Sequence, residues 1–131
     1  MSTIFSKIIS GEIPAYKIAE NDNYLAFLDI MPLVKGHVLV IPKKEVDYIF
    51  DLEDDTLSGL MVFAKKVSKA IDKAISCTRV GVAVIGLEVP HTHVHLVPLN
   101  KMDDINFTRP KLSLSEQEMT EIQEKILRHL D

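Results

Sequence analysis

The sequence predicts one α+β domain over residues 1–131, with a mainly antiparallel sheet, one central amphipathic helix and a second helix near the C-terminal end. Of its 131 residues, 47% are hydrophobic and 26% are charged, a balance typical of globular domains and sufficient for a core. Apolar runs of strand length follow one another before and after a single long segment with helical periodicity. Strands in series around one helix favour an antiparallel sheet over alternating parallel βαβ units.

Five short apolar segments have the composition of β-strands. They are rich in Val, Ile, Leu, Tyr and Phe, and turn-forming or proline residues bound them, as expected where a strand must end. Pro42 and Pro98, for example, each follow or close such a run. The expected strands are Lys17–Ala19, Tyr24–Ile30, His37–Ile41, Val80–Ile85 and His91–Val97.

The hydrophobic period changes between residues 57 and 74, where apolar residues recur three and four positions apart. This spacing predicts an amphipathic helix, and the acidic residues ahead of it suit a helix N-terminus. A second helix is expected over Ser115–Leu130, because Ser115 and Glu118 have the spacing of a capping box. The residues expected to bury the central helix are Leu60, Ala64, Val67 and Ile71.

Charge and cysteine content argue against several function classes. The net charge of −4 does not favour an extended nucleic-acid surface, although small phosphorylated ligands need only local donors. Cys77 is the only cysteine, so no intramolecular disulfide can form, which fits a reducing compartment. No signal-peptide pattern and no apolar run of membrane-spanning length is evident. We therefore expect a cytoplasmic protein without a nucleic-acid or membrane partner.

Three of the five histidines stand two residues apart within the apolar segment that ends at Pro98. Side chains in a β-strand alternate between its faces, so His91, His93 and His95 are expected on one face of a strand. Such a row is a candidate site, because imidazole can act as base, acid, nucleophile or metal ligand near neutral pH. The alternative is a structural role, which would require a hydrogen-bond partner for each buried ring.

Two chemistries bring several imidazoles together. A zinc ion needs ligands that converge at about 2.0–2.1 Å, whereas alternate residues on one strand point roughly parallel. In the other chemistry, one imidazole attacks an electrophile while its neighbours orient it and stabilise charge. The parallel row favours the nucleophile and leaves a histidine-ligated metal site as the weaker alternative.

The chain resembles the histidine triad (HIT) family. The signature His-x-His-x-His followed by two apolar residues is matched by residues 91–97, and further segments agree in the same order. Ile4–Ala15 is similar to the family's N-terminal segment, Phe27–Pro32 to its nucleoside-binding strand, and Gly36–Lys44 to the strand that follows. The resemblance extends over residues 4 to about 99 and implies a HIT-like fold.

The resemblance also implies nucleotide binding and hydrolysis at the α-phosphorus, with no cofactor. It assigns His93 as the nucleophile, which forms a nucleotidyl-imidazole intermediate that water then cleaves. The backbone carbonyl of the third histidine, here His95, is expected to accept the hydrogen bond that orients His93. His91 is expected to contact the phosphate or the leaving group, and His37 to support the row from the neighbouring strand.

The nucleotide site implied by the resemblance has an apolar slot for the base and a carboxylate for the ribose hydroxyls. Many family members carry Gln and then Ser or Thr after the glycine that corresponds to Gly86, whereas Leu87 and Glu88 stand here. A carboxylate cannot donate a hydrogen bond to phosphate unless it is protonated, so different phosphate contacts are expected. Thr3 and Ser6 stand where some bacterial members carry zinc-binding cysteines, which gives no support for that zinc site. The expected nucleotide-binding residues are Phe5, Ile8, Phe27, Asp29, Ile30, Glu88 and Val89.

The expected function is that of a nucleotide hydrolase or transferase acting on purine nucleoside phosphoramidates, with dinucleoside polyphosphates or acyl-adenylates as related substrates. A nucleotide-binding protein with little turnover, acting as a sensor or partner, is the alternative. The resemblance also implies a twofold homodimer.

Overall fold

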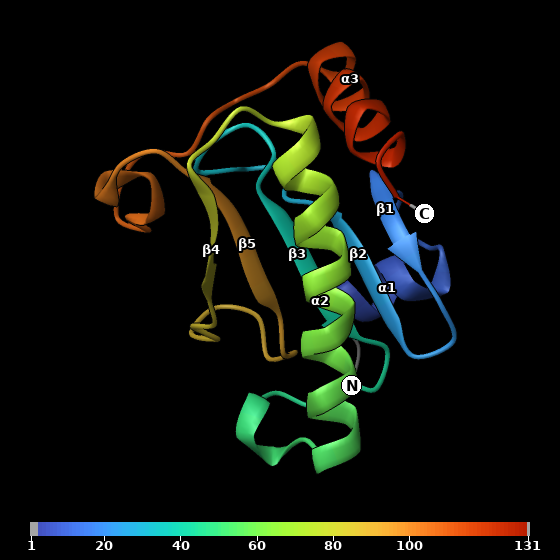
Figure 1. Ribbon diagram of the computed structural model, residues 1–131. Helices are drawn as coiled ribbons and strands as arrows, with labels where there is room; N and C mark the ends of the chain where they lie inside the picture. The colour runs from blue at the N-terminus through green and yellow to red at the C-terminus, as the bar shows by residue number, and fades with distance from the viewer. Residues whose placement is uncertain (1–2, 131) are drawn as a thin grey trace.

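Five antiparallel strands form the sheet that carries the candidate site (Figure 1). The structure is a computed structural model that describes residues 3–130, and its strands lie in the order β1-β2-β3-β5-β4. Two short 3₁₀ helices, η1 (Ile49–Asp51) and η2 (Met102–Ile105), lie in the connections. The strands are β1 (Lys17–Glu20), β2 (Tyr24–Leu28), β3 (Val38–Pro42), β4 (Arg79–Ala83) and β5 (Val94–Leu99), and the helices are α1 (Ile4–Ser10), α2 (Asp54–Ala74) and α3 (Glu116–Leu127).

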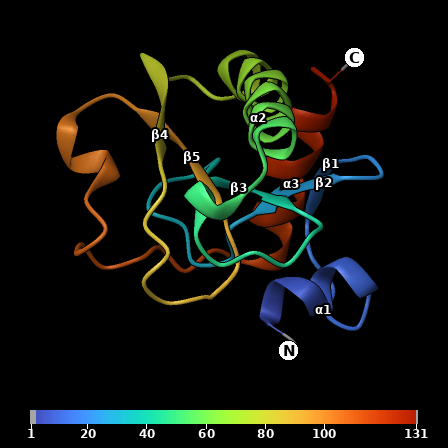
Figure 2. The ribbon, with the colours of Figure 1, turned by 90° about the horizontal axis from the view of Figure 1, so that it is seen from below.

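Helices cover both faces of the sheet, which is why β2 and β3 are buried along their whole length. Figure 2 shows α2 on one side of the sheet and α1 on the other. Alternate residues divide between two apolar clusters accordingly: Val38 and Val40 pack in the cluster that contains α2, whereas Leu39 and Ile41 pack in the one that contains α1. The α1 side of the sheet is the side that carries the histidines.

The expected α+β class, the central helix and the C-terminal helix are confirmed. Four residues of α2 predicted to face the core are at most 2% exposed: Leu60, Ala64, Val67 and Ile71. At the start of α3, the Ser115 hydroxyl accepts a hydrogen bond from the Glu118 N–H at 3.1 Å, and the Glu118 carboxylate accepts one from the Ser115 N–H at 3.2 Å. Among residues 3–130, none of the helices combines the length and apolarity that crossing a bilayer requires.

Helix α1 is an element that the sequence pattern did not predict. The Ser6 N–H donates to the Thr3 hydroxyl at 3.1 Å and the Thr3 N–H donates to the Ser6 hydroxyl at 2.7 Å, so the two residues form a capping box. Gly11 ends the helix in the left-handed region, with φ of +88°. Capping thus occupies the hydroxyls at Thr3 and Ser6 and holds Phe5 and Ile8 against the sheet, where both are 6% exposed.

The segment with the three histidines is a strand only in its second half. The expected strand began at His91, but β5 begins at Val94, and residues 91–93 form an irregular connection before it. The prediction that one strand face presents all three imidazoles is therefore wrong for His91 and His93. The alternation of polar and apolar residues imitates a strand, while the local backbone turns so that the His91 N–H bonds to the Val89 carbonyl at 2.8 Å.

Candidate active site

Four buried histidines gather on the α1 side of the sheet, from three different segments. His95 lies on β5 opposite Leu39 of β3, and His37 immediately precedes β3. His91 and His93 come from the connection before β5. The exposed fractions are 1% for His37, 0% for His91, 7% for His93 and 8% for His95.

His93 is oriented by a backbone carbonyl next to it in the chain. Its Nδ1 donates to the carbonyl oxygen of His91 at 2.7 Å, which leaves the Nε2 lone pair of the neutral ring available. No described residue bonds to that Nε2 atom. The expectation that the His95 carbonyl accepts this bond is wrong. His95 lies on the regular strand β5, where backbone carbonyls point along the sheet. The bend at residues 91–93 instead turns the His91 carbonyl toward the His93 ring.

A relay of hydrogen bonds fixes the protonated nitrogen of His37 and of His95. The Leu33 N–H donates to Nδ1 of His37 at 3.0 Å, so a proton of neutral His37 must sit on Nε2. Nε2 of His37 lies 3.0 Å from Nδ1 of His95 and therefore donates to it. His95 in turn carries its proton on Nε2, beside His93, whose ring centroid is 5.0 Å away. The site thus places an N–H donor next to a nucleophilic lone pair.

The His91 ring lies in the protein interior and does not face a ligand. The ring is fully buried, and Nε2 donates to the Pro42 carbonyl at 2.8 Å. Nδ1 is buried without a hydrogen-bond partner among the described residues. The expectation that His91 contacts the phosphate or the leaving group therefore does not fit its position, because both the ring edge and its donor face the interior. Its carbonyl, which holds His93, is its contribution to the site.

Burial keeps the relay histidines neutral. Desolvation, with smaller contributions from the charges of neighbouring groups, lowers the pKa of His37 to about 3 and that of His95 to about 4. For both groups, Lys111 adds a positive charge that opposes protonation. The pKa of His91 is lowered as well, again mainly by desolvation. At neutral pH the relay therefore holds single protons on defined nitrogens.

Asp29 stands at the end of β2, beside the relay. Its N–H donates to the His37 carbonyl at 3.0 Å, and one carboxylate oxygen accepts the Met31 N–H at 2.9 Å. The other lies 3.7 Å from Nε2 of His37, which is not an ion pair because His37 is neutral. Desolvation raises the pKa of Asp29. The carboxylate is partly exposed, at 21% of its side chain, and so can reach a ligand.

One group of side chains has the spacing of a metal site, but its hydrogen-bond donors and acceptors are not arranged as in one. The group consists of Asp29, His37 and His95. One potential ligand atom from each lies within 4.8 Å of the others. A metal-bound histidine normally donates its second ring N–H to an acceptor. Here Nδ1 of His37 accepts from Leu33, which keeps the proton on Nε2, the nitrogen that a metal would need. The direction of the Leu33–His37 hydrogen bond therefore favours a relay that holds a proton over a metal centre.

An apolar cluster adjoins the histidines, and it contains most of the residues expected to bind a base. The Phe5 ring lies edge-on to Phe27, with centroids 5.6 Å apart, and its centroid is 5.0 Å from that of His93. Ile8 and Val89 pack in the same cluster. Ile30 does not: it is 64% exposed, because the chain turns at Asp29 as β2 ends. Glu88 is exposed, and its charge raises the pKa of Asp29, so it faces the same side of the site.

Three contributors to the site could not be read from side-chain identity. The Leu33 N–H and the Pro42 carbonyl are backbone groups, and any residue could supply them at those positions. Phe107 covers His95 with ring centroids 4.7 Å apart, although it lies twelve positions further along the chain. An unpaired aromatic residue in a polar loop was the only signal for Phe107.

Comparison with known proteins agrees with this geometry. The HIT domain family matches residues 10–102. A HIT-like protein of Borreliella burgdorferi is 38% identical over 131 residues, covering 94% of each chain. The adenosine 5'-monophosphoramidase hnt1 of Schizosaccharomyces pombe is 36% identical over 128 residues, covering 96% of each chain. The crystal structure of a Hit-like protein from Bartonella henselae superposes with a TM-score of 0.86 at 30% identity, covering 98% of this chain and 96% of that one. The chain therefore belongs to the HIT family.

Proposed function

We propose that this protein is a nucleotide hydrolase or transferase that acts at the α-phosphorus of purine nucleoside phosphoramidates or related nucleotides through a nucleotidyl-His93 intermediate. One observation carries the proposal: the His93–His91 hydrogen bond leaves a ring lone pair free beside the N–H donor of His95. The yeast relative named adenosine 5'-monophosphoramidase, matched over 96% of both chains, supports the reaction class.

The proposed reaction has two displacement steps. Nε2 of His93 attacks the α-phosphorus, the bond from phosphorus to the leaving group breaks, and the leaving amine departs with a proton taken from solvent. Water then attacks the nucleotidyl-imidazole, which releases the nucleoside monophosphate and regenerates His93. The Nε2–H of His95 donates to a non-bridging phosphate oxygen, where negative charge increases in the transition state.

The nucleoside would lie along the same side of the sheet. The Phe5 and Phe27 rings form an apolar wall next to His93, which suits a flat base. Asp29, exposed at its carboxylate and close to the relay, would accept hydrogen bonds from the ribose hydroxyls.

Replacing Asp29 with Ala should weaken binding of a ribonucleotide while scarcely changing binding of its 2′,3′-dideoxy analogue. Hydrogen bonds to a charged acceptor contribute roughly 1.5–3 kcal/mol, so the dissociation constant should rise about 10- to 150-fold. Isothermal titration of catalytically inactive His93→Ala protein, with and without the Asp29 substitution, measures both ligands without turnover. Equal losses for the two ligands would assign Asp29 a structural role only.

The second candidate is a nucleotide-binding protein with little turnover. Leu87 is 87% exposed, and Glu88 stands where a phosphate donor is common in the family, so neither side chain supplies such a donor to phosphate. Steady-state assay of adenosine 5'-phosphoramidate separates the two candidates: release of ammonia and AMP supports the enzyme, whereas tight binding with no release supports the binding protein. A cytoplasmic location stays a prediction.

We also propose that a second copy of the chain covers the apolar surface along β4. This strand lies at the sheet edge beside α2 (Figure 1), so its outer backbone groups have no sheet partner among residues 3–130. Val82 of β4 and Met61 of α2 are 53% and 40% exposed. An isologous twofold contact would pair the two edges and bury both patches together. Between α2 and the edge lies a cavity of about 190 Å³, lined by Met61, Ala64, Lys65, Ser68, Val82 and Leu96.

Sedimentation velocity at micromolar concentration should give a dimer for the wild type and a monomer for Val82→Asp. The substitution places a carboxylate in each of the two apolar patches that the contact would bury, where both carboxylates lose solvent. Thr120→Asp, which adds the same charge on an exposed position of α3 away from β4, should remain dimeric. A wild type that sediments as a monomer throughout this range would reject the proposal.

A further inference from the structure

The segment Phe107–Leu112, here called the strap, leads from η2 toward α3 on the α1 side of the sheet (Figure 2). It has no regular secondary structure, yet it makes hydrogen bonds with groups that hold the relay and a ring contact, from Phe107, with His95. None of its side chains was a candidate from the sequence. Its contacts with the connection between β2 and β3 give it a role in the site.

The strap fixes the peptide that orients His37. The Leu112 N–H donates to the Pro32 carbonyl at 2.8 Å, and the N–H of the same peptide unit, that of Leu33, donates to Nδ1 of His37 at 3.0 Å. A peptide unit is planar, so bonds at its two ends determine its orientation. Each of these bonds also polarises the other, because the carbonyl accepts while the N–H donates.

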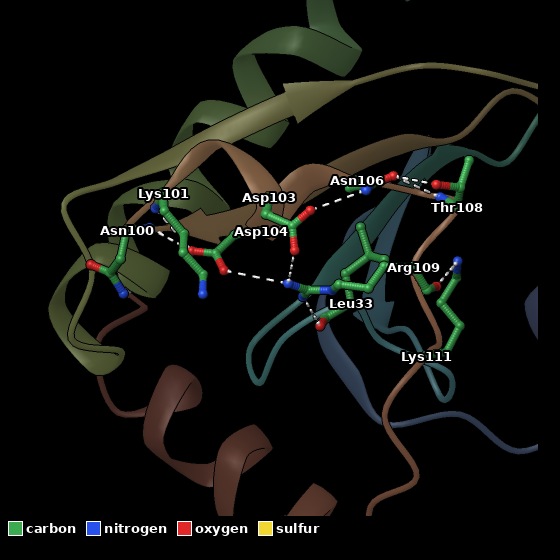
Figure 3. A network of polar contacts seen from close by, with 9 residues as sticks. All are labelled: Leu33, Asn100, Lys101, Asp103, Asp104, Asn106, Thr108, Arg109 and Lys111. Atoms are coloured by element: carbon green, nitrogen blue, oxygen red, sulfur yellow. Dashed lines mark hydrogen bonds and ion pairs between the residues drawn. The ribbon is translucent and has the colours of Figure 1, made fainter.

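Arg109 holds the next peptide along. Its guanidinium donates to the Leu33 carbonyl at 2.7 Å from one nitrogen, and another nitrogen lies 3.1 Å from Asp103 and 3.8 Å from Asp104 (Figure 3). Asp104 is itself fixed, since its carboxylate accepts the backbone N–H groups of Asn100 and Lys101 at 2.8 and 3.1 Å. The planar fork of Arg109 thus ties Leu33 to an anchored carboxylate, which a single-point cation could not do with the same geometry.

Phe107 completes the enclosure of the relay. Its ring centroid lies 4.7 Å from that of His95 and 6.3 Å from that of His37, in both cases edge to face. The Lys111 ammonium donates to the Phe107 carbonyl at 2.7 Å and lies 5.9 Å from the centroid of the Phe107 ring. These two contacts join the two ends of the strap. An enclosed relay excludes water, which would otherwise satisfy either nitrogen of each ring and scramble the proton positions.

We propose that Arg109 is a positioning residue: through Leu33 and His37 it keeps the proton of His95 on Nε2, where that N–H can face the substrate phosphate. The inference rests on the proposed function only for the identity of what His95 contacts. The relay itself is a property of the free protein. Arg109 touches no reacting atom, and its effect reaches the substrate through four successive hydrogen-bonded groups: Arg109, the Leu33 backbone, His37 and His95.

Long-range nitrogen–proton NMR of the imidazoles in the free protein tests the relay without any turnover. In the wild type, His37 and His95 should each show the Nε2–H tautomer. Arg109→Met keeps the aliphatic stem but removes every donor, so a mixture of tautomers should appear at His95. With adenosine 5'-phosphoramidate, kcat should fall roughly tenfold while KM changes less than about twofold, as expected for a misplaced catalytic donor.

Two matched variants complete the design. Thr108→Ala removes a hydrogen bond from the strap to the preceding residue Asn106, which does not contact Leu33, so both readouts should stay as in the wild type. Arg109→Lys keeps the charge and one donor, so kcat and the tautomer populations should lie between those of wild type and Arg109→Met. If Arg109→Met does not fold, the kcat and the tautomer populations of Arg109→Lys test the inference in its place. Wild-type tautomers together with wild-type kcat in the Arg109 variants would overturn the inference. A wild type without turnover would refute the proposed function and leave the tautomer result standing.

Discussion

Replacing His93 with Ala should abolish turnover and leave a folded protein that still binds nucleotide. The nucleophile forms a bond to phosphorus that no neighbouring group can replace, whereas the Phe5 wall and Asp29 supply affinity for the ground state. The rate should fall by about 10³-fold or more, as when the nucleophile of a covalent mechanism is removed. Single-turnover kinetics, together with titration of a non-hydrolysable nucleotide analogue, separates the two effects.

The neighbouring histidines provide the controls. His91→Ala should be less severe, because the carbonyl that orients His93 belongs to the backbone and survives the substitution. His95→Ala should also be less severe, because it removes a hydrogen-bond donor to the phosphate and leaves the nucleophile in place, typically at a cost of about 10²-fold. A His93→Ala protein with near-normal hydrolysis would exclude the covalent route and favour the binding-protein or metal alternatives.

Acidification should destabilise the protein steeply between pH 6.5 and pH 4. In this window the unfolded chain binds protons at His37 and His95, whose ordinary pKa is about 6.5, while the folded protein does not, because their pKa values are lowered to about 3 and about 4. The free energy of unfolding therefore falls as pH falls. The full slope is about 1.4 kcal/mol per pH unit and per group, and it is reached only below pH 6.5, where the unfolded rings are fully protonated, so the loss between pH 6.5 and pH 4.5 is about 4.5 kcal/mol for the pair. The raised pKa of Asp29 acts in the opposite sense and offsets part of it.

Urea unfolding at pH 7 and at pH 4.5 measures this loss, and His37→Phe identifies its source. The variant lacks one of the two relay rings and keeps an aromatic side chain in contact distance of Phe107 and His95. Its stability at pH 7 should be lower, because His95 loses its donor, but its stability should depend less steeply on pH, because one of the rings with a lowered pKa is gone. The same slope in the two proteins would show that His37 is protonated in the folded state and that the relay does not exist as described.

The parts of the fold that the sequence predicted are those with a long repeated signal. The stripe along α2 extends over several turns, and Leu60, Val67 and Ile71 are fully buried as that stripe requires. Helix α1 has only seven residues, too few to establish a period, so its apolar residues were not recognised as helical. Its start depends on the capping box of Thr3 and Ser6, two residues that are common in many other settings.

The sequence predicted which histidines lie close together but not the hydrogen bonds between them. His37, His93 and His95 meet as expected, because antiparallel pairing of β3 with β5 brings them together. The carbonyl that orients His93 was assigned to the wrong residue, because a spacing of two looks the same in a strand and in the bend that precedes β5. A bond made by a backbone group, such as that from the Leu33 N–H to His37, cannot be predicted from side-chain identity. The contact of Arg109 with Leu33 could not be predicted either, because the two residues are 76 positions apart in the sequence.

Trapping the intermediate tests the central claim most directly. Wild-type protein quenched in alkali during turnover, which preserves phosphorus–nitrogen bonds, should carry a nucleotidyl adduct on the tryptic peptide 80–101. Because His91, His93 and His95 all lie on this peptide, fragmentation within it is needed to assign the adduct. We expect the added mass on His93 and none in the His93→Ala protein. Turnover at full rate with no adduct, or an adduct on His91 or His95, would contradict the account.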